Sequence, residues 1–516
     1  MIAFVGLCIL KLAVASHLSP FGDEAFYWLE SRHPAWGYSD LPPMTAWLIL
    51  LGERVAGHGL LGMRWPFLVL GAALPWLVVW FAREAFDGRA GWQAGLLCLA
   101  LPLAGSLGVM ALPDVPLTVA IMLALVALLR AMRDGRLADW CLLGMALAMA
   151  WMTHYRAAMA MFAGLLLFVL TPRGRLQWRL GGFWCAMMVA SLGLLPLVIS
   201  NVQQGGAGIT FQVMQRNAWQ FQPDALVQPL EQAIACTPLL YGVLLWVAWT
   251  SWRRRGDGAP WDVIAITSLG FIVPYFVFGL FADDLRFRAH WPLPGYLPLL
   301  AAVPVLWRGR ASTQRRALAG CTFALAALGQ LAGLGYLGVA AMPGAVTSLA
   351  TLKAFPRHFV GWQESGEVAA HLIDQQPRVM VADNFMLAAE LAFQLDGKVP
   401  VYALDSSLNV KHGRAPQLAA WKLDESGLRL AHAGEPIWLA VDETSLRERE
   451  RHAWLESVCG RIADVQPMQR LDLFGGAKRI AFYGGRVPAE PAPAAADCVI
   501  ARDAQLPPSP RNRDEP

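Results

Sequence analysis

The sequence predicts an α-helical polytopic membrane protein with a C-terminal periplasmic α/β domain. The first observation is composition, because 56% of the 516 residues are hydrophobic and only 16% are charged, whereas charged residues make up about a quarter of a soluble domain. The second is a series of apolar stretches close to the roughly 20 residues that span a bilayer. The third is a change to a soluble-like composition after about residue 361.

About eleven apolar stretches predict transmembrane helices. They lie at about residues 2–18, 63–82, 91–109, 114–132, 139–153, 157–171, 181–200, 233–252, 262–281, 291–307 and 317–341. The fifth and sixth are separated by the polar tetrapeptide 153–156, which predicts a turn. The first contains Ala13-Val14-Ala15 and lacks a basic leader, so a signal peptide is the alternative. Its removal would leave an even number of spans, in conflict with the arginine pattern.

Arginines recur at alternate connections and orient the chain. With the amino terminus inside, one set of connections holds Arg83, Arg89, Arg130, Arg133, Arg136, Arg173, Arg175, Arg179, Arg253, Arg254, Arg255, Arg308, Arg310, Arg315 and Arg316. This positive-inside pattern predicts that set on the cytoplasmic side. The segments 22–43 and 201–230, and everything after about residue 345, are then periplasmic. The formal net charge of +4 gives no reason to expect nucleic acid as a partner.

A small α/β domain is predicted within a division into 1–344 (transmembrane), 345–488 (periplasmic) and 489–516 (disordered tail). Helical stretches are expected at 363–375, 385–395 and 445–458, and strand-like runs at 378–382, 399–404, 436–441 and 479–483. The tail is rich in Pro and Ala, which favours disorder. Six of the eight cysteines lie in or beside apolar stretches, and the sequence leaves a Cys459–Cys498 disulfide open.

The segment 22–43, GDEAFYWLESRHPAWGYSDLPP, places acidic and aromatic side chains between apolar stretches. Carboxylates beside a bilayer are costly unless they pair, coordinate or catalyse. The candidates in this segment are Asp23, Glu24, Asp40, Tyr27 and Tyr38. Together they describe a site for a polar headgroup or a sugar. The alternative for the first two acids is a helix cap, since a helical stretch follows them.

Three motifs resemble one known family. They are G-D-E-A-x-Y-W at residues 22–28, W-G-Y-x-D-x-P-P at 36–43 and R-A-H-W-P-L-P-G-Y at 288–296. Together they resemble the bacterial GT-C glycosyltransferases of the protein mannosyltransferase-like group (glycosyltransferase families 39 and 83), which includes aminoarabinose transferases acting on lipid A. The resemblance covers the membrane region to about residue 310, and residues 390–393 also look like bacterial members. It implies a GT-C type membrane fold.

The resemblance also implies an activity. Such enzymes pass a sugar from a polyprenyl phosphate to an envelope acceptor (lipid A or lipopolysaccharide, a glycan or a protein) at the periplasmic face of the inner membrane. It implies that Asp23 and Glu24 are catalytic, with Asp23 as the general base for the acceptor hydroxyl. The sequence names neither sugar nor acceptor. The alternatives are a polytopic lipid or solute transporter, which the scarcity of ionisable residues within the spans disfavours, and a non-catalytic scaffold.

The donor phosphate requires cations that the first loop lacks. Where the aminoarabinose transferases carry basic residues, this chain has Phe26 and Leu41. We expect donor-phosphate or substrate binding from residues predicted on the same face as Asp23. These are Asp40, Tyr27, Tyr38, His154, Tyr155, Arg156, Arg286, Arg288 and His290. The alternative for the basic residues is to anchor lipid headgroups or to pair with Asp283 or Asp284.

A divalent metal is left open. The resemblance implies an acidic residue near such an ion at Asp40, and His154 or His290 would complete the site. No H-x-x-H spacing supports it.

Other polar positions carry two interpretations each. Asp114 is either a helix cap or a residue that orients the acceptor or a metal. The segment 201–230 is predicted to be a substrate-gating loop rather than a simple connector. Asp383 and Asp405 follow strand-like runs, where caps and turns are favoured over ligand-binding carboxylates.

Overall fold

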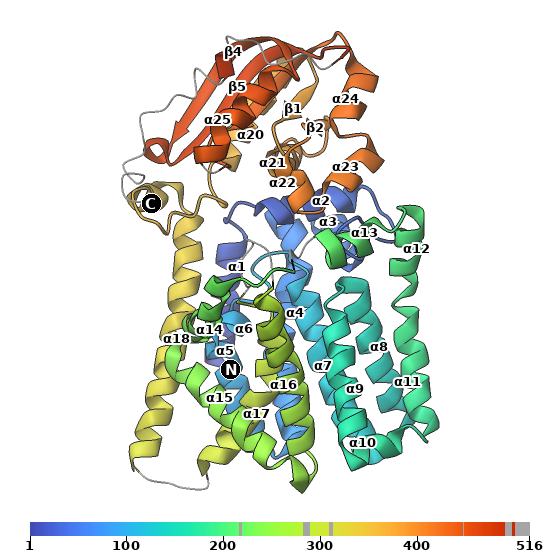
Figure 1. Ribbon diagram of the computed structural model, residues 1–516. Helices are drawn as coiled ribbons and strands as arrows, with labels where there is room; N and C mark the ends of the chain where they lie inside the picture. Colours follow the sequence, from blue (N-terminus) through green and yellow to red (C-terminus); the bar gives the residue numbers. More distant parts are fainter. Residues whose placement is uncertain (216–218, 282–288, 309–312, 447, 491–497, 501–516) are drawn as a thin grey trace. The chain divides into compact units, whose positions relative to one another are not determined.

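The computed structural model describes residues 1–516 except 216–218, 282–288, 309–312, 447, 491–497 and 501–516. The chain divides into two compact units (Figure 1). The helical unit comprises Met1–Ala15, Ala35–Gly57 and Leu61–Tyr336. The α/β unit comprises Ser16–Pro34, His58–Leu60 and Leu337–Pro516. The acidic and aromatic segment 22–43 is therefore divided between the two units.

The helical unit is built from helices alone in its described residues. They are α1 (Ile2–Ala15), α3 (Met44–Ala56), α4 (Leu60–Ala85), α5 (Gly88–Ala100), α6 (Pro102–Gly105), α7 (Asp114–Asp134), α8 (Leu137–Thr153), α9 (Ala157–Leu170), α10 (Pro172–Gln177), α11 (Gly181–Leu192), α12 (Leu195–Gln203), α13 (Ala207–Thr210), η1 (Phe211–Gln215), η2 (Pro223–Val227), α14 (Gln228–Cys236), α15 (Pro238–Arg253), η3 (Arg255–Asp257), α16 (Trp261–Gly279), α17 (Leu293–Arg308) and α18 (Thr313–Ala340). Each of the eleven predicted stretches overlaps one or two of them.

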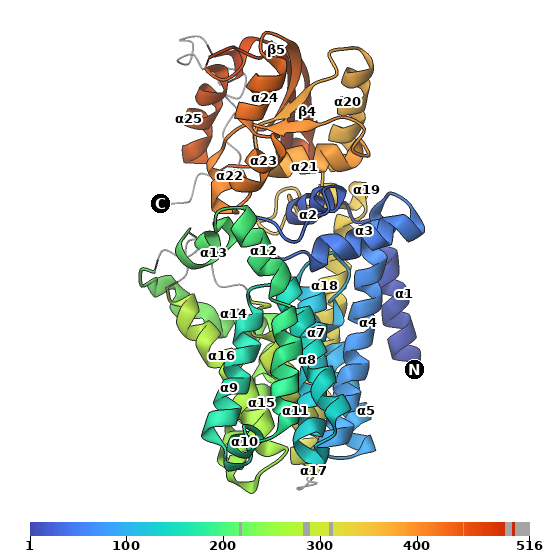
Figure 2. The same cartoon turned by 90° about the vertical axis from the view of Figure 1, so that its right-hand side faces the viewer.

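The number of membrane spans stays a prediction. Five helical segments within the described part of the chain are long and apolar enough to cross a membrane, or six if one bent pair is a single span. Of the five, α7 is the most enclosed, with 89% of its apolar window buried. It packs against α8 and α17, and α8 packs against α11 (Figure 2). A Cβ at Gly144 would lie 2.7 Å from the Ala186 carbonyl oxygen, so a glycine permits this close helix crossing.

Ion pairs show which turns lie at the same end of the helical unit. Arg133 Nη1 lies 2.8 Å from Glu84 Oε2, and Arg130 Nε lies 2.8 Å from Asp139 Oδ1. These contacts join the ends of α4 and α7 to the start of α8. Arginine-rich turns predicted on one side of the membrane thus meet one another, while the opposite end of α7 begins with Asp114.

The described part of the α/β unit contains a five-stranded sheet in the order β2-β1-β3-β5-β4. Its strands are β1 (Met380–Ala382), β2 (Val401–Ala403), β3 (Pro436–Asp442), β4 (Ala463–Leu473) and β5 (Lys478–Arg486). The first three are parallel, whereas β5 runs antiparallel to both β3 and β4 (Figure 1). The four predicted strands are confirmed. β4 was not predicted, because it is mostly exposed, contains Pro467 and lacks regular apolar alternation.

Helix α2 belongs to the α/β unit although it comes early in the chain. The helices of this unit are α2 (Gly22–Arg32), α19 (Pro343–Val346), η4 (Thr347–Leu349), α20 (Trp362–Asp374), α21 (Phe385–Gln394), α22 (Ser407–Lys411), α23 (Ala415–Trp421), α24 (Glu425–His432), α25 (Glu448–Cys459) and η5 (Phe474–Gly476). α2 packs against α21. The ring centroids of Phe26 and Phe385 are 5.5 Å apart, and those of Trp28 and Phe393 are 5.2 Å apart. Half of the predicted acidic loop is therefore a core element of the α/β unit.

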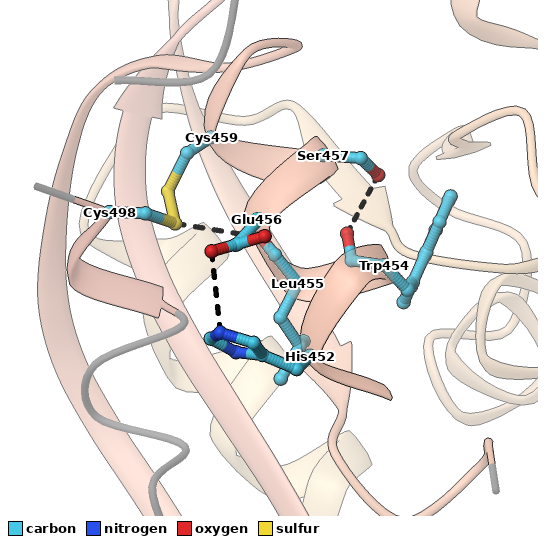
Figure 3. The surroundings of a disulfide bond; sticks show 7 residues. All are labelled: His452, Trp454, Leu455, Glu456, Ser457, Cys459 and Cys498. Carbon is cyan, nitrogen blue, oxygen red and sulfur yellow. Dashed lines mark hydrogen bonds and ion pairs between the residues drawn. A yellow bond between two sulfur atoms is a disulfide. The ribbon is translucent and has the colours of Figure 1, made fainter. Parts of the chain in front are cut away.

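A disulfide joins Cys459 to Cys498, the pair that the sequence leaves open (Figure 3). Cys459 ends α25, where His452 and Glu456 form an ion pair at 3.3 Å. Cys498 lies in the predicted tail 489–516, most of which falls outside the described residues. The other six cysteines are free and belong to the helical unit.

Candidate functional site

Asp23 and Glu24 lie in the first turn of α2. The carboxylate of Glu24 accepts a hydrogen bond from the backbone N–H of Phe21 at 3.2 Å, so it stabilises the start of the helix. Glu24 is fully buried, whereas 18% of the Asp23 side chain is exposed. Of the two acids, Asp23 is therefore the one that an incoming molecule can reach.

Arg414 joins Asp23 to another acid of α2. Its Nη2 lies 3.2 Å from Asp23 Oδ1, and its Nη1 lies 3.4 Å from Glu30 Oε1. The two acids are seven residues apart, about two helical turns, so they share a face of the helix. The Arg414 side chain is only 2% exposed. A charge buried to this degree needs partners, because an unpaired one is strongly destabilising.

Two histidines lie near the carboxylate of Asp23. His412 Nδ1 is 3.8 Å from Asp23 Oδ1. Burial lowers the pKa of His358, and nearby cations lower it further, although the charge of Asp23 acts in the opposite direction. His358 is therefore neutral at pH 7, and Arg414 supplies permanent positive charge beside Asp23. Asp23, Glu30, His412 and Arg414 are termed the α2 group.

Sequence reasoning identified Asp23 but missed Arg414 and His412. The local signal is a short basic run at 411–414 that follows the strand-like run 399–404. Nothing in that run points to residue 23, because the contact arises from the packing of α2 on the α/β unit.

Further predicted residues meet in the helical unit around Asp114, the first residue of α7. Arg156 Nη2 lies 2.6 Å from Asp114 Oδ1, and His290 Nε2 lies 3.3 Å from the same oxygen. The guanidinium of Arg156 lies 5.3 Å from the centroid of the Trp291 ring, which adds a cation–π contact. Asp114, Arg156 and His290 are termed the α7 group. Asp114 thus acts as a charge partner as well as starting a helix.

Asp40 and Tyr38 are buried within the helical unit. The carbonyl oxygen of Asp40 accepts a hydrogen bond from Gln212 Nε2 at 2.8 Å. The hydroxyl of Tyr155 accepts one from Asn201 Nδ2 at 3.1 Å. Burial raises the pKa of Tyr155, and the charge of Asp40 adds to that rise. The hydroxyl therefore stays protonated and can donate a hydrogen bond to a ligand.

The segment 201–230 is largely helical over its described residues, through the end of α12, α13, η1, η2 and the start of α14. This corrects the expectation of a long loop. The segment supplies Asn201 and Gln212, so it packs directly against predicted substrate residues. Its gating role stays a proposal.

The described residues contain no group of three or more His, Cys, Asp or Glu side chains that could hold a metal ion. His154, one of the candidate ligands, is buried and accepts a hydrogen bond at Nδ1 from the backbone N–H of Arg156 at 3.0 Å. Arg286 and Arg288, together with Asp283 and Asp284, lie outside the described residues.

The structure distributes the remaining predicted residues between the two units. Those of the α/β unit are Asp23, Glu24 and Tyr27. Those of the helical unit are Asp40, Tyr38, His154, Tyr155, Arg156 and His290.

Comparison with known proteins identifies similar chains. The model of the dolichyl-phosphate-mannose-protein mannosyltransferase family matches residues 40–199. The lipid A galacturonosyltransferase RgtD of Rhizobium johnstonii is 26% identical over 249 residues, which are 46% of this chain and 50% of the relative. The chain thus spans about half the length of this curated relative.

Solved structures are similar over most of the chain. ArnT from Cupriavidus metallidurans, bound to undecaprenyl phosphate, matches with a TM-score of 0.67 at 15% identity and covers 94% of this chain and 97% of its own. The archaeal oligosaccharyltransferase AglB from Archaeoglobus fulgidus, in complex with an inhibitory peptide and a dolichol-phosphate, matches with a TM-score of 0.50 at 12% identity. That match covers 88% of this chain and 70% of AglB. At these identities the likeness concerns the fold.

Proposed function

We propose that this chain, a GT-C glycosyltransferase, transfers a glycosyl group from a polyprenyl-phosphate sugar donor to an envelope acceptor at the periplasmic face of a bacterial inner membrane. The family model supports the donor class, because its description names a dolichyl-phosphate-linked sugar. ArnT, which has a similar fold, was solved with undecaprenyl phosphate. The name of RgtD supports lipid A as an acceptor to test first, beside glycans and proteins.

The observation that carries the proposal is a partly exposed carboxylate, Asp23, paired with a buried arginine at the start of a buried helix. Asp23 takes the proton of the acceptor hydroxyl while the acceptor oxygen bonds to the anomeric carbon. The bond from that carbon to the phosphate oxygen breaks, and its electron pair leaves with the polyprenyl phosphate. A phosphate is already a fair leaving group, so a base and good positioning suffice for this step.

The α7 group supplies cations for the donor. Arg156 and His290 share one carboxylate oxygen of Asp114, and a donor phosphate offers them a larger negative charge. An arginine binds phosphate through two parallel N–H donors. In this proposal Asp40, Tyr38 and Tyr155 contact the sugar.

We also propose eleven spans, the domain division given above and a periplasmic α/β unit. The Cys459–Cys498 disulfide supports this orientation, because disulfides persist in oxidising compartments. Spheroplasts treated with a reductant and then a membrane-impermeant maleimide should become labelled at both positions. Labelling that requires lysis would overturn the orientation.

Transfer by the purified protein in vesicles tests the activity. The assay supplies a panel of undecaprenyl-phosphate sugars with lipid A as the first acceptor. Asp23→Asn should lower kcat by roughly 10²–10⁴-fold and leave donor binding intact. The matched control is Asp374→Asn, because Asp374 is an exposed acid at the end of α20.

The outcomes separate the candidate functions. Transfer by Asp23→Asn at the wild-type rate overturns the assignment of the base. Donor movement across the membrane without transfer supports a lipid or solute transporter. Neither movement nor transfer with any donor supports a non-catalytic scaffold.

A further inference from the structure

Helix α2 presents two carboxylates to one arginine, and their surroundings differ. Only 1% of the Glu30 side chain is exposed, against 18% of the Asp23 side chain. Glu30 therefore anchors Arg414 in the interior, while Asp23 meets the other Nη nitrogen where solvent has access. A guanidinium holds its donors in a rigid planar fork, so fixing one end sets the direction of the other.

Aromatic rings hold this guanidinium in place. Its central carbon lies 4.3 Å from the ring centroid of Phe26, 5.0 Å from that of Tyr27 and 5.7 Å from that of Phe385. A cation over an aromatic face is attracted by the ring, most strongly away from water. Phe26 stands three residues after Asp23, at a position where the aminoarabinose transferases carry a basic residue. Because Phe26 is apolar, the positive charge beside this turn of α2 comes from Arg414.

We propose that Arg414 is a positioning residue for sugar transfer, which orients the carboxylate of Asp23 and keeps it ionised, with Glu30 as its anchor. This rests on the proposed function, in which Asp23 is the base. A carboxylate beside a fixed cation stays ionised to lower pH, so it remains able to take the acceptor proton. Removing the cation raises the pKa of Asp23. The fall of kcat/KM at low pH, termed the acidic limb, then occurs at higher pH.

Other ionisable groups surround Asp23 on the elements that pack together here. They are Glu24 and Glu30 on α2, and His412 and His358 on the segments flanking α22 and α20. A carboxylate of this set, when ionised, opposes ionisation of Asp23. Arg414 is charged at every pH of interest, so it is the permanent cation of this set.

The rate profile from about pH 3 to 9 tests the proposal, because an aspartate titrates near pH 4 without its cation. For Arg414→Gln, the acidic limb of kcat/KM should move up by about 1–2 pH units. Arg414→Lys should return the limb toward the wild-type pH, because it keeps the charge, with a lower plateau because the fork is lost. Glu30→Gln is the matched control. It removes the anchor's charge but keeps the cation, so its limb should not move to higher pH.

Arg414→Gln leaves Glu30 buried without its cation, which is destabilising. The double variant Glu30→Gln/Arg414→Gln removes both charges, so it should show a smaller limb shift in the same direction in a folded protein. Thermal unfolding of each variant checks the fold.

An unmoved limb, with activity lowered equally at every pH, overturns the proposal because it indicates packing alone. A higher donor KM with an unmoved limb also overturns it and indicates phosphate binding. Different results refute the role of Asp23 as the base and the role of Arg414 as its positioning residue. Transfer by Asp23→Asn at the wild-type rate refutes the role of Asp23, whereas an inactive Asp23→Asn variant with an unmoved Arg414→Gln limb refutes only the role of Arg414.

Discussion

The α2 group and the α7 group contain the same residue types in different settings. Each places an aspartate in the first turn of a helix, beside an arginine, a histidine and aromatic rings. In the α2 group, Arg414 is 2% exposed and contacts both Asp23 and Glu30. In the α7 group, Arg156 is 12% exposed and His290 is 40% exposed.

The difference teaches what each arginine can do. An arginine buried between two carboxylates is fixed, because moving it would leave charges unpaired in the interior. An arginine that is closer to solvent can exchange one anion for another at lower cost. We therefore expect the α2 group to orient a base and the α7 group to bind a ligand.

The largest expected effect comes from replacing the aspartate of each group with asparagine and comparing the two variants. Asp23→Asn should lower kcat by roughly 10²–10⁴-fold, because it removes the base. Asp114→Asn should keep kcat within about tenfold, with a donor KM that is unchanged or lower because Arg156 loses a competing anion. Steady-state kinetics with both substrates varied separates these results. Equal losses of kcat in both variants would remove the distinction between the groups.

A second test removes the disulfide of the α/β unit. Cys459→Ser/Cys498→Ser should lower the free energy of unfolding by about 2–4 kcal/mol, measured by denaturant titration with a probe in the α/β unit. Donor binding should be unchanged, because the α7 group lies in the helical unit. Cys321→Ser, at an exposed free cysteine, is the control. A change in donor affinity would show that the α7 group depends on the disulfide.

A third test targets the cation of the α7 group. Arg156→Gln should raise the donor KM by about 10–100-fold, since a hydrogen bond to a charged group contributes about 1.5–3 kcal/mol. The acidic limb of kcat/KM should stay at the wild-type pH. Arg156→Lys should restore part of the affinity, because the charge remains. A limb shift like that expected for Arg414→Gln would contradict the separate roles.

A fourth test is a titration confined to the α/β unit. Burial raises the pKa of Asp383 to about 8, and the charge of Asp442 adds to the rise. Below about pH 4 this carboxyl is protonated in the folded and unfolded states alike. From about pH 4 to 8 only the unfolded state releases the proton, so stability falls by about 1.4 kcal/mol per pH unit from this group.

Asp383→Asn should therefore flatten the pH dependence of unfolding in that window. Asp374→Asn, at an exposed acid that ends α20, should leave it unchanged. Denaturant titrations at pH 5, 6, 7 and 8 measure the slope. A wild-type slope in Asp383→Asn would mean that other groups cause it.

Local apolar patterns were sufficient to predict most of the long helices and four of the five strands, whereas α3 (Met44–Ala56) and the short helices α22, α23 and α24 were not predicted. The turn between α8 and α9 was predicted from the polar residues 153–156, and it carries Arg156 into contact with Asp114. Topology alone had placed those two residues on one side of the membrane. Their direct pairing needed the packed helices.

The α2 group was only half predictable. Asp23 stands in a recognisable motif, whereas Arg414 lies 391 residues away along the chain. Its place depends on how the aromatic face of α2 packs on α21, and no local pattern encodes that pairing. The sequence showed that Phe26 stands where the aminoarabinose transferases carry a basic residue. It did not show that Arg414 supplies positive charge beside α2.

The packing of α2 against late segments also sets an order of assembly during synthesis. The chain must extend from the end of α2 at Arg32 to the end of α23 at Trp421 before all of its partners exist. At about 5–20 residues per second, that wait is roughly 20–80 seconds. A nascent or truncated chain thus carries the helix with Asp23 but lacks Arg414. In the proposed function, Asp23 therefore lacks its positioning arginine until residue 414 has been synthesised.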